Sequence, residues 1–188
     1  MGDLLFSAGV SFGRSVVGIV TRPYETYRKL VDRGSLWELV YVGALVLLYC
    51  FISRIQIAPV IFTYLVTVGL FWHIGRLFGT KARFSGFLLG WGYTLIPTLV
   101  WFWMTTLLYV LVPPPRTTSP QGMIFSVLYL LFSATLLFWK VTLAYLALRF
   151  GLRMDLAKIS ATCAIVLPML GVYSFWMYRL GIFRIPFI

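Results

Sequence analysis

Few ionisable side chains in this 188-residue chain could do chemistry, and Lys140 is the first of them. It lies inside a long apolar stretch, nine residues before Arg149, which is about 13 Å at the rise of an α-helix. A charge at that depth in a membrane faces the interior of a helix bundle or a water-filled path. Lys140 is either a structural lysine bonded to carbonyls freed by Pro97 or Pro168, or part of a transport or ligand path. The hydroxyl groups expected at the same depth belong to Thr94, Thr98, Tyr145 and Thr162.

His73 and Arg76 extend this candidate intramembrane polar site, although packing at the membrane interface is the simpler interpretation of both. A single histidine with no cysteine or carboxylate at ligand spacing predicts no metal site. Glu38 follows Ser35 by three residues, which is typical of a capping box that opens a helix. The sequence contains no CxxC or HExxH motif. We therefore expect neither catalytic residues nor a cofactor, and predict that the protein is not an enzyme.

Glycine and proline residues mark the places where helices are expected to pack closely or to kink. Gly86 and Gly90 form a GxxxG step, which favours close helix packing in membranes. Pro97 and Pro168 lie near the middle of long apolar segments, and each removes a backbone donor and kinks its helix. Such breaks line the binding sites of some transporters. Kinks that serve packing alone are the plainer interpretation.

The composition shows which elements must position these residues. Hydrophobic residues make up 61% of the chain and charged residues only 11%, too few to cover a water-soluble surface. We predict an all-α integral membrane protein in which residues 36–188 form a bundle of five transmembrane helices. Each apolar segment is long enough, or nearly so, to cross roughly 30 Å of hydrocarbon. The predicted spans are residues 36–53, 57–75, 86–112, 123–148 and 156–178.

Residues 1–35 precede these spans and are predicted to form one or two amphipathic helices at the cytoplasmic face of the membrane. In the first helix, the polar residues gather on one stripe and apolar residues fill the other faces, as in a helix that lies in the interface plane. The stripe consists of Ser7, Ser11, Arg14, Ser15 and Gly18. A second short helix follows Pro23, with Tyr24, Tyr27, Leu30 and Val31 expected to face inward.

The net charge of +11 is distributed as a topology signal. With the N-terminus in the cytoplasm and the C-terminus on the opposite side, 11 of the 16 Lys and Arg residues lie on the cytoplasmic side. The opposite side receives only Arg54, Arg116, Arg179 and Arg184. Nucleic acid is therefore not an expected partner. The basic face is instead expected to attract membrane lipids, including those with anionic headgroups.

The sequence from residue 73 to residue 97 resembles the core of the Yip1 family. Members of that family carry a histidine and a basic residue at the end of one span, a Gly-Gly-Lys-like turn, and then a span with a tyrosine and a proline. The matching residues here are His73, Gly79, Lys81, Tyr93 and Pro97. Thr80 stands where the second glycine of the turn is expected. Residues 22–27 are similar to the segment that precedes the family's first span.

The resemblance implies a five-span protein with a cytoplasmic N-terminus. Eukaryotic members bind Rab GTPases in vesicle traffic, and some bacterial relatives accompany ABC-type exporters. The compact N-terminal part is typical of a bacterial member of the inner membrane. The implied role is that of a non-enzymatic scaffold or accessory subunit of a larger membrane complex, with an ABC-type transporter or a second copy of the chain as its partner. The alternative is a small transporter or channel that uses the proline-broken helices and Lys140.

Overall fold

The computed structural model of the chain describes residues 2–80, 82–111 and 119–182, with side chains described from residue 5 onward. Every regular element in these residues is a helix, which confirms the predicted all-α fold. The helices are α1 (Gly2–Thr21), α2 (Pro23–Arg33), α3 (Glu38–Ile52), α4 (Ile57–Leu77), α5 (Phe84–Tyr93), α6 (Leu95–Leu111), α7 (Pro120–Leu146), the π-helix η1 (Ala147–Gly151) and α8 (Leu156–Arg179).

The long helices are apolar enough and long enough to cross a membrane. Four such spans are present: α4, the α5–α6 pair, α7 with η1, and α8. The helix α3 is a shorter fifth apolar helix of 15 residues, about 22 Å long at 1.5 Å per residue. It meets α2 at an angle of 112°, so α2 turns sharply away from the axis of α3. The chain is therefore an integral membrane protein with four to five spans.

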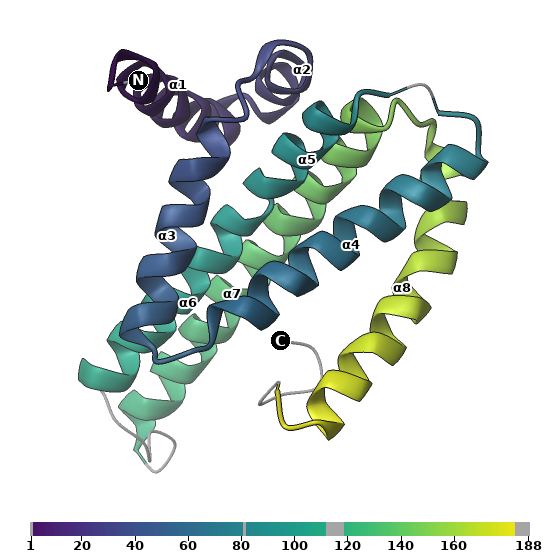
Figure 1. The fold of residues 1–188 in the computed structure, drawn as a ribbon. Helices are drawn as coiled ribbons and strands as arrows, with labels where there is room; N and C mark the ends of the chain where they lie inside the picture. Colours follow the sequence, from purple (N-terminus) through teal and green to yellow (C-terminus); the bar gives the residue numbers. More distant parts are fainter. Residues whose placement is uncertain (1, 81, 112–118, 183–188) are drawn as a thin grey trace.

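The two N-terminal helices lie together at one end of the bundle, the upper end in Figure 1. We call it the α1–α2 end. The chain runs away from this end along α3, returns along α4, leaves again along α5 and α6, and returns along α7 (Figure 1). The connections from α4 to α5 and from η1 to α8 consequently lie at the α1–α2 end as well. These turns bring the residues of several elements together there.

The short helix α5 occupies the centre of the buried part of the protein. Its residues belong to two apolar clusters, one shared with α1, α2 and α7 and the other shared with α4, η1 and α8. Tyr27 and Leu30 of α2 are buried against it, as the sequence predicted. Tyr24 is 57% exposed, contrary to expectation, and the edge of its ring contacts Phe150 with 4.8 Å between the centroids.

The orientation of α1 differs from the expected one. Within its polar stripe, Ser11 and Ser15 point into the protein and donate hydrogen bonds to Glu38, whereas Arg14 is exposed. The outward face is apolar, with exposed side chains of Phe6, Val10, Val17 and Val20. A helix with an apolar outer face is favourable where that face meets lipid. The pattern indicated an amphipathic helix correctly, but the polar side is the one that binds the bundle.

The π-helix η1 ends α7 next to α5. A π-turn is wider than an α-turn and re-aims the side chains that follow it. Gly151, its last residue, lies so close to α5 that a Cβ atom there would be 3.1 Å from the Cα atom of Phe87. Arg153, two residues further on, has a left-handed φ of 53°. The turn between η1 and α8 is therefore tightly constrained.

We predict that Gly151→Ala lowers the free energy of unfolding by about 1–3 kcal/mol, because the new methyl group meets backbone that cannot easily move. Gly69→Ala in α4 is the matched control, since a Cβ atom there has nothing within 4 Å. The control is expected to be neutral or slightly stabilising. Unfolding of the purified protein in mixed micelles measures both. Equal stabilities for the two variants would contradict the close contact between η1 and α5.

Candidate functional site

Lys140 lies in α7, half-buried, and forms no hydrogen bond or ion pair within the described part of the chain. Two of the hydroxyl groups expected near Lys140 donate hydrogen bonds to other groups, and a third has no partner among the described residues. Thr94 donates to the carbonyl of Trp91, and Thr162 donates to the sulfur of Met154. The hydroxyl of Thr98 is buried without a described partner. None of these groups is hydrogen-bonded to Lys140 among the described residues, and the role of Lys140 as a polar site stays a prediction.

His73 and Arg76 are both exposed near the end of α4. The guanidinium of Arg76 lies over the ring of Trp72, 5.2 Å from the centroid, in a cation–π contact. No hydrogen bond joins either residue to Lys140 among the described residues. Gly79 follows in the turn with a φ of 76°, a left-handed conformation that favours glycine. Lys81 lies outside the described residues.

Three of the four expected packing and kink positions, Gly86, Gly90 and Pro97, lie in or next to α5, whereas Pro168 lies in α8. Gly86 and Gly90 both face α2, and a Cβ atom on Gly86 would collide with the carbonyl of Val31. The helix break falls at Thr94, and Pro97 lies in the first turn of α6, where a missing backbone donor costs little. Pro168 is exposed within α8, which continues as one helix through it.

Glu38 carries a buried carboxylate that its sequence context did not indicate. It is 2% exposed and forms no capping box, because Ser35 accepts a hydrogen bond from the backbone of Trp37 and the start of α3 has no side-chain cap. The Glu38 carboxylate instead accepts hydrogen bonds from Ser11 at 2.9 Å, from Ser15 at 3.4 Å and from Tyr93 at 2.5 Å. We call these four residues the Glu38 cluster. It joins α1, α3 and α5.

Two further tyrosines bond to the backbone of α5 next to this cluster. The hydroxyl of Tyr27 donates to the carbonyl of Gly90 at 3.2 Å, and that of Tyr64 donates to the carbonyl of Leu88 at 2.7 Å. Burial raises the pKa of the Tyr27 phenol, so this side chain stays a donor at neutral pH. The helices α2 and α4 thus each place a phenol against the backbone of α5. The helix α3 places the Glu38 carboxylate against the side chain of Tyr93 in α5. The family-motif residue Tyr93 lies at the centre of this arrangement.

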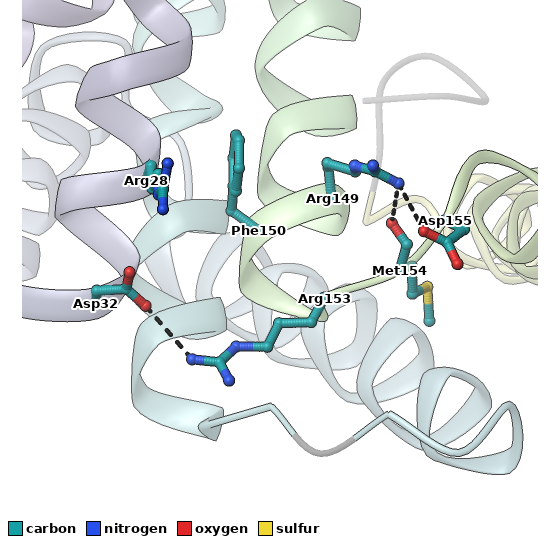
Figure 2. Close-up of a pocket in the computed structure, with 7 residues that line it drawn as sticks. All are labelled: Arg28, Asp32, Arg149, Phe150, Arg153, Met154 and Asp155. Carbon is teal, nitrogen blue, oxygen red and sulfur yellow. Dashed lines mark hydrogen bonds and ion pairs between the residues drawn. The ribbon is translucent and has the colours of Figure 1, made fainter.

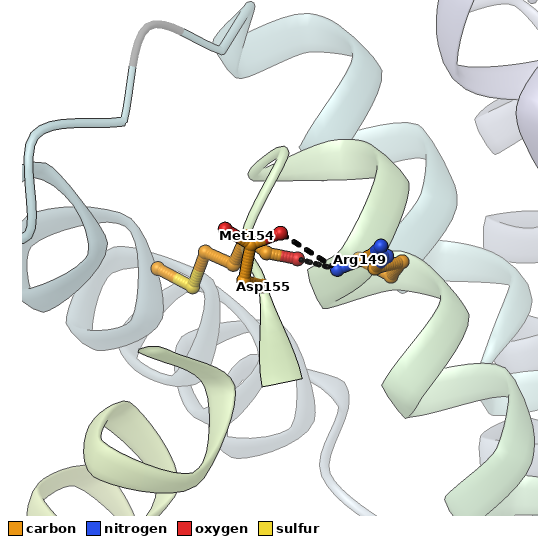
Figure 3. Close-up of polar contacts among 3 residues, drawn as sticks. All are labelled: Arg149, Met154 and Asp155. Carbon is orange, nitrogen blue, oxygen red and sulfur yellow. Dashed lines mark hydrogen bonds and ion pairs between the residues drawn. The ribbon is translucent and has the colours of Figure 1, made fainter. Parts of the chain in front are cut away.

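A second polar arrangement lies at the α1–α2 end, between α2 and the turn that follows η1. It is a cavity of about 390 Å³, which we call the arginine pocket, lined by Arg28, Asp32, Arg149, Phe150, Arg153, Met154 and Asp155 (Figure 2). Arg149 donates to the carboxylate of Asp155 and to the carbonyl of Met154, both at 3.0 Å (Figure 3). Arg153 lies 3.5 Å from the carboxylate of Asp32, which ties this turn to α2.

The chemistry of the arginine pocket is that of charge recognition. Three guanidinium groups and two carboxylates line it, and its described residues include no serine, cysteine or histidine that could act as a nucleophile or base. Arg28 lies across the pocket from Arg149 in Figure 2, with Phe150 between them. The arginines of this pocket were recognised from the sequence only as part of the general excess of basic residues on the predicted cytoplasmic side.

We predict that Lys140→Met leaves the free energy of unfolding unchanged or raises it, because the change removes a charge that has no partner in the described protein. Tyr64→Phe is the comparison within the same bundle. It removes the donor to the carbonyl of Leu88 and is expected to cost about 1–3 kcal/mol. Unfolding in mixed micelles measures both. A loss from Lys140→Met as large as that from Tyr64→Phe would reveal a structural bond to the lysine.

Comparison with known proteins agrees with the motif residues. The family model of the Yip1 domain matches residues 17–178, which include α2 to α7, nearly all of α8 and the Tyr93 and Pro97 positions. No curated protein and no solved structure matches the chain. Because the family model covers most of the chain and the helices are long and apolar enough to span a membrane, the protein is a membrane-spanning member of the Yip1 family.

Proposed function

We propose that this protein is a non-enzymatic scaffold or accessory subunit that binds another membrane protein in the plane of a bacterial inner membrane. The observation that carries the proposal is an exposed face of small residues on α8. This face, which we call the α8 small-residue face, consists of Ala157, Ala161, Ala164, Pro168 and Gly171. Steps of four and three residues keep all five within about 40° of one line along the helix.

The α8 small-residue face points away from the rest of the protein. Ile159, Thr162 and Val166 are buried on the opposite side of α8, where the helix packs against α4. Ala157, Ala164 and Pro168 are exposed, and a Cβ atom on Gly171 would have nothing within 4 Å. Figure 1 shows α8 at the edge of the bundle. No other described helix covers this face.

Small residues have a specific use within membranes. Lipid tails are as apolar as leucine, so helices associate there through close backbone packing rather than through the hydrophobic effect. Alanine and glycine along one line allow that close approach. A transmembrane helix of a partner therefore fits the α8 small-residue face better than it fits the large side chains exposed on α7, such as Leu131 and Phe138.

The distribution of Lys and Arg supports an orientation of the protein in which the α1–α2 end lies in the cytoplasm. The partners we favour on the strength of the family resemblance are an ABC-type transporter and a second copy of the chain. The rival proposal, a small transporter or channel, would use Lys140 in a polar path. The lack of a described hydrogen-bond partner for Lys140 gives that rival no support.

Affinity purification of the tagged protein in a mild detergent tests the proposal. We expect a membrane protein, or a second copy of the chain, to copurify in a fixed ratio. Ala164→Leu should weaken this association about tenfold or more, because the larger side chain prevents close packing of the backbones. Ala44→Leu, the same change at an exposed position of α3, is the matched control and should leave it intact.

One result would contradict the scaffold proposal, and another would contradict its assignment to the α8 small-residue face. The first is a protein that purifies without a partner and moves solute in liposomes, which would favour the transporter. The second is an association that survives Ala164→Leu as well as it survives Ala44→Leu, which would place the contact away from the α8 small-residue face.

A further inference from the structure

We propose that the arginine pocket binds a phosphate group, carried either by an anionic lipid headgroup or by a soluble phosphate compound. This inference does not depend on the α8 small-residue face. The pocket lies at the α1–α2 end, whereas the proposed partner contact runs along the length of α8.

The charge of the pocket favours an anion. Three arginines and two aspartates line the cavity, so its formal charge is +1 before a ligand binds. Arg28 has no hydrogen bond or ion pair with any described residue, which leaves a whole guanidinium available. A guanidinium offers donors in a planar fork that matches the oxygens of phosphate.

The two ion pairs in the pocket differ in geometry, and this difference points to where the anion would bind. Arg149 donates at 3.0 Å both to Asp155, whose side chain is 81% exposed, and to the carbonyl of Met154, so it has two partners. Arg153 is only 3.5 Å from Asp32, and the two side chains are 65% and 51% exposed. Exposed pairs of this kind contribute little to stability. A phosphate group can therefore replace Asp32 as the partner of Arg153 and bind Arg28 at the same time.

The shape of the pocket favours a phosphate group over a carboxylate. The guanidinium groups come from α2, from η1 and from the turn before α8, so they approach the cavity from different sides. Phosphate presents oxygens in several directions, whereas a carboxylate presents two in one plane. A volume of about 390 Å³ is sufficient for a headgroup.

The surroundings of the pocket suit the headgroup layer of a membrane. The rings of Tyr24 and Phe150 pack edge to face, 4.8 Å apart, and both residues belong to the elements that form the pocket. Tyrosine is enriched at the membrane interface, and basic pockets between helices on the cytoplasmic side bind anionic headgroups.

The test uses the full-length protein in detergent with two probes. Native mass spectrometry measures the retention of phosphatidylglycerol against phosphatidylcholine, and thermal unfolding measures stabilisation by inorganic phosphate against chloride at equal ionic strength. Arg28→Gln is the main variant, since it breaks no described contact. We expect it to weaken binding of the preferred probe about tenfold. Arg14→Gln, the same charge change at an exposed position of α1, should leave binding unchanged.

The outcomes separate the two sources of phosphate. Preferential retention of phosphatidylglycerol that is lost in Arg28→Gln identifies a lipid headgroup. Stabilisation by inorganic phosphate without lipid preference, also lost in Arg28→Gln, identifies a soluble phosphate compound. The proposal is overturned if neither probe binds, or if Arg14→Gln weakens binding as much as Arg28→Gln, because the effect would then be that of net charge alone.

Discussion

A single buried carboxylate imposes the constraint on which the α1–α2 end of this protein depends. Glu38 is the first residue of α3 and is 2% exposed, and burying a charge is costly unless hydrogen bonds replace the lost water. Ser11 and Ser15 of α1 and Tyr93 of α5 supply those bonds. The helix α1 therefore turns Ser11 and Ser15 toward the bundle, and its apolar face with Phe6, Val10, Val17 and Val20 remains exposed.

The helix α5 is the second half of the same arrangement. It carries Tyr93 one residue before the break at Thr94, and it receives hydrogen bonds from Tyr27 and Tyr64 on its backbone carbonyls. The glycines of α5 let α2 approach closely enough for Tyr27 to reach the carbonyl of Gly90. Because η1 also packs on α5, the arginine pocket between η1 and α2 is positioned by the same short helix.

The apolar segments predicted the helices because membrane crossing needs long, nearly uninterrupted apolar runs, and the order of residues along the chain reveals such runs. The partners of Glu38 could not be predicted, since the spacing of Ser35 and Glu38 also fitted a capping box. The Glu38 side chain instead bonds to residues that are distant in the sequence. A lone acid at the edge of an apolar segment, with serines spaced along a preceding helix, was the available signal. Both Pro97 and Pro168 were expected to kink a helix, but the two prolines occupy different places in their helices. Pro97 lies in the first turn of α6, whereas α8 continues through Pro168.

A double-mutant cycle between Glu38 and Tyr93 tests most directly whether this carboxylate joins the helices. Glu38→Leu, Tyr93→Phe and the double variant are unfolded in mixed micelles, and Glu38→Leu with Tyr64→Phe provides a cycle between residues that share no described hydrogen bond. The account predicts a coupling free energy of about 1–3 kcal/mol for the Glu38–Tyr93 pair and much less for the control pair. Additive effects of Glu38→Leu and Tyr93→Phe would contradict it.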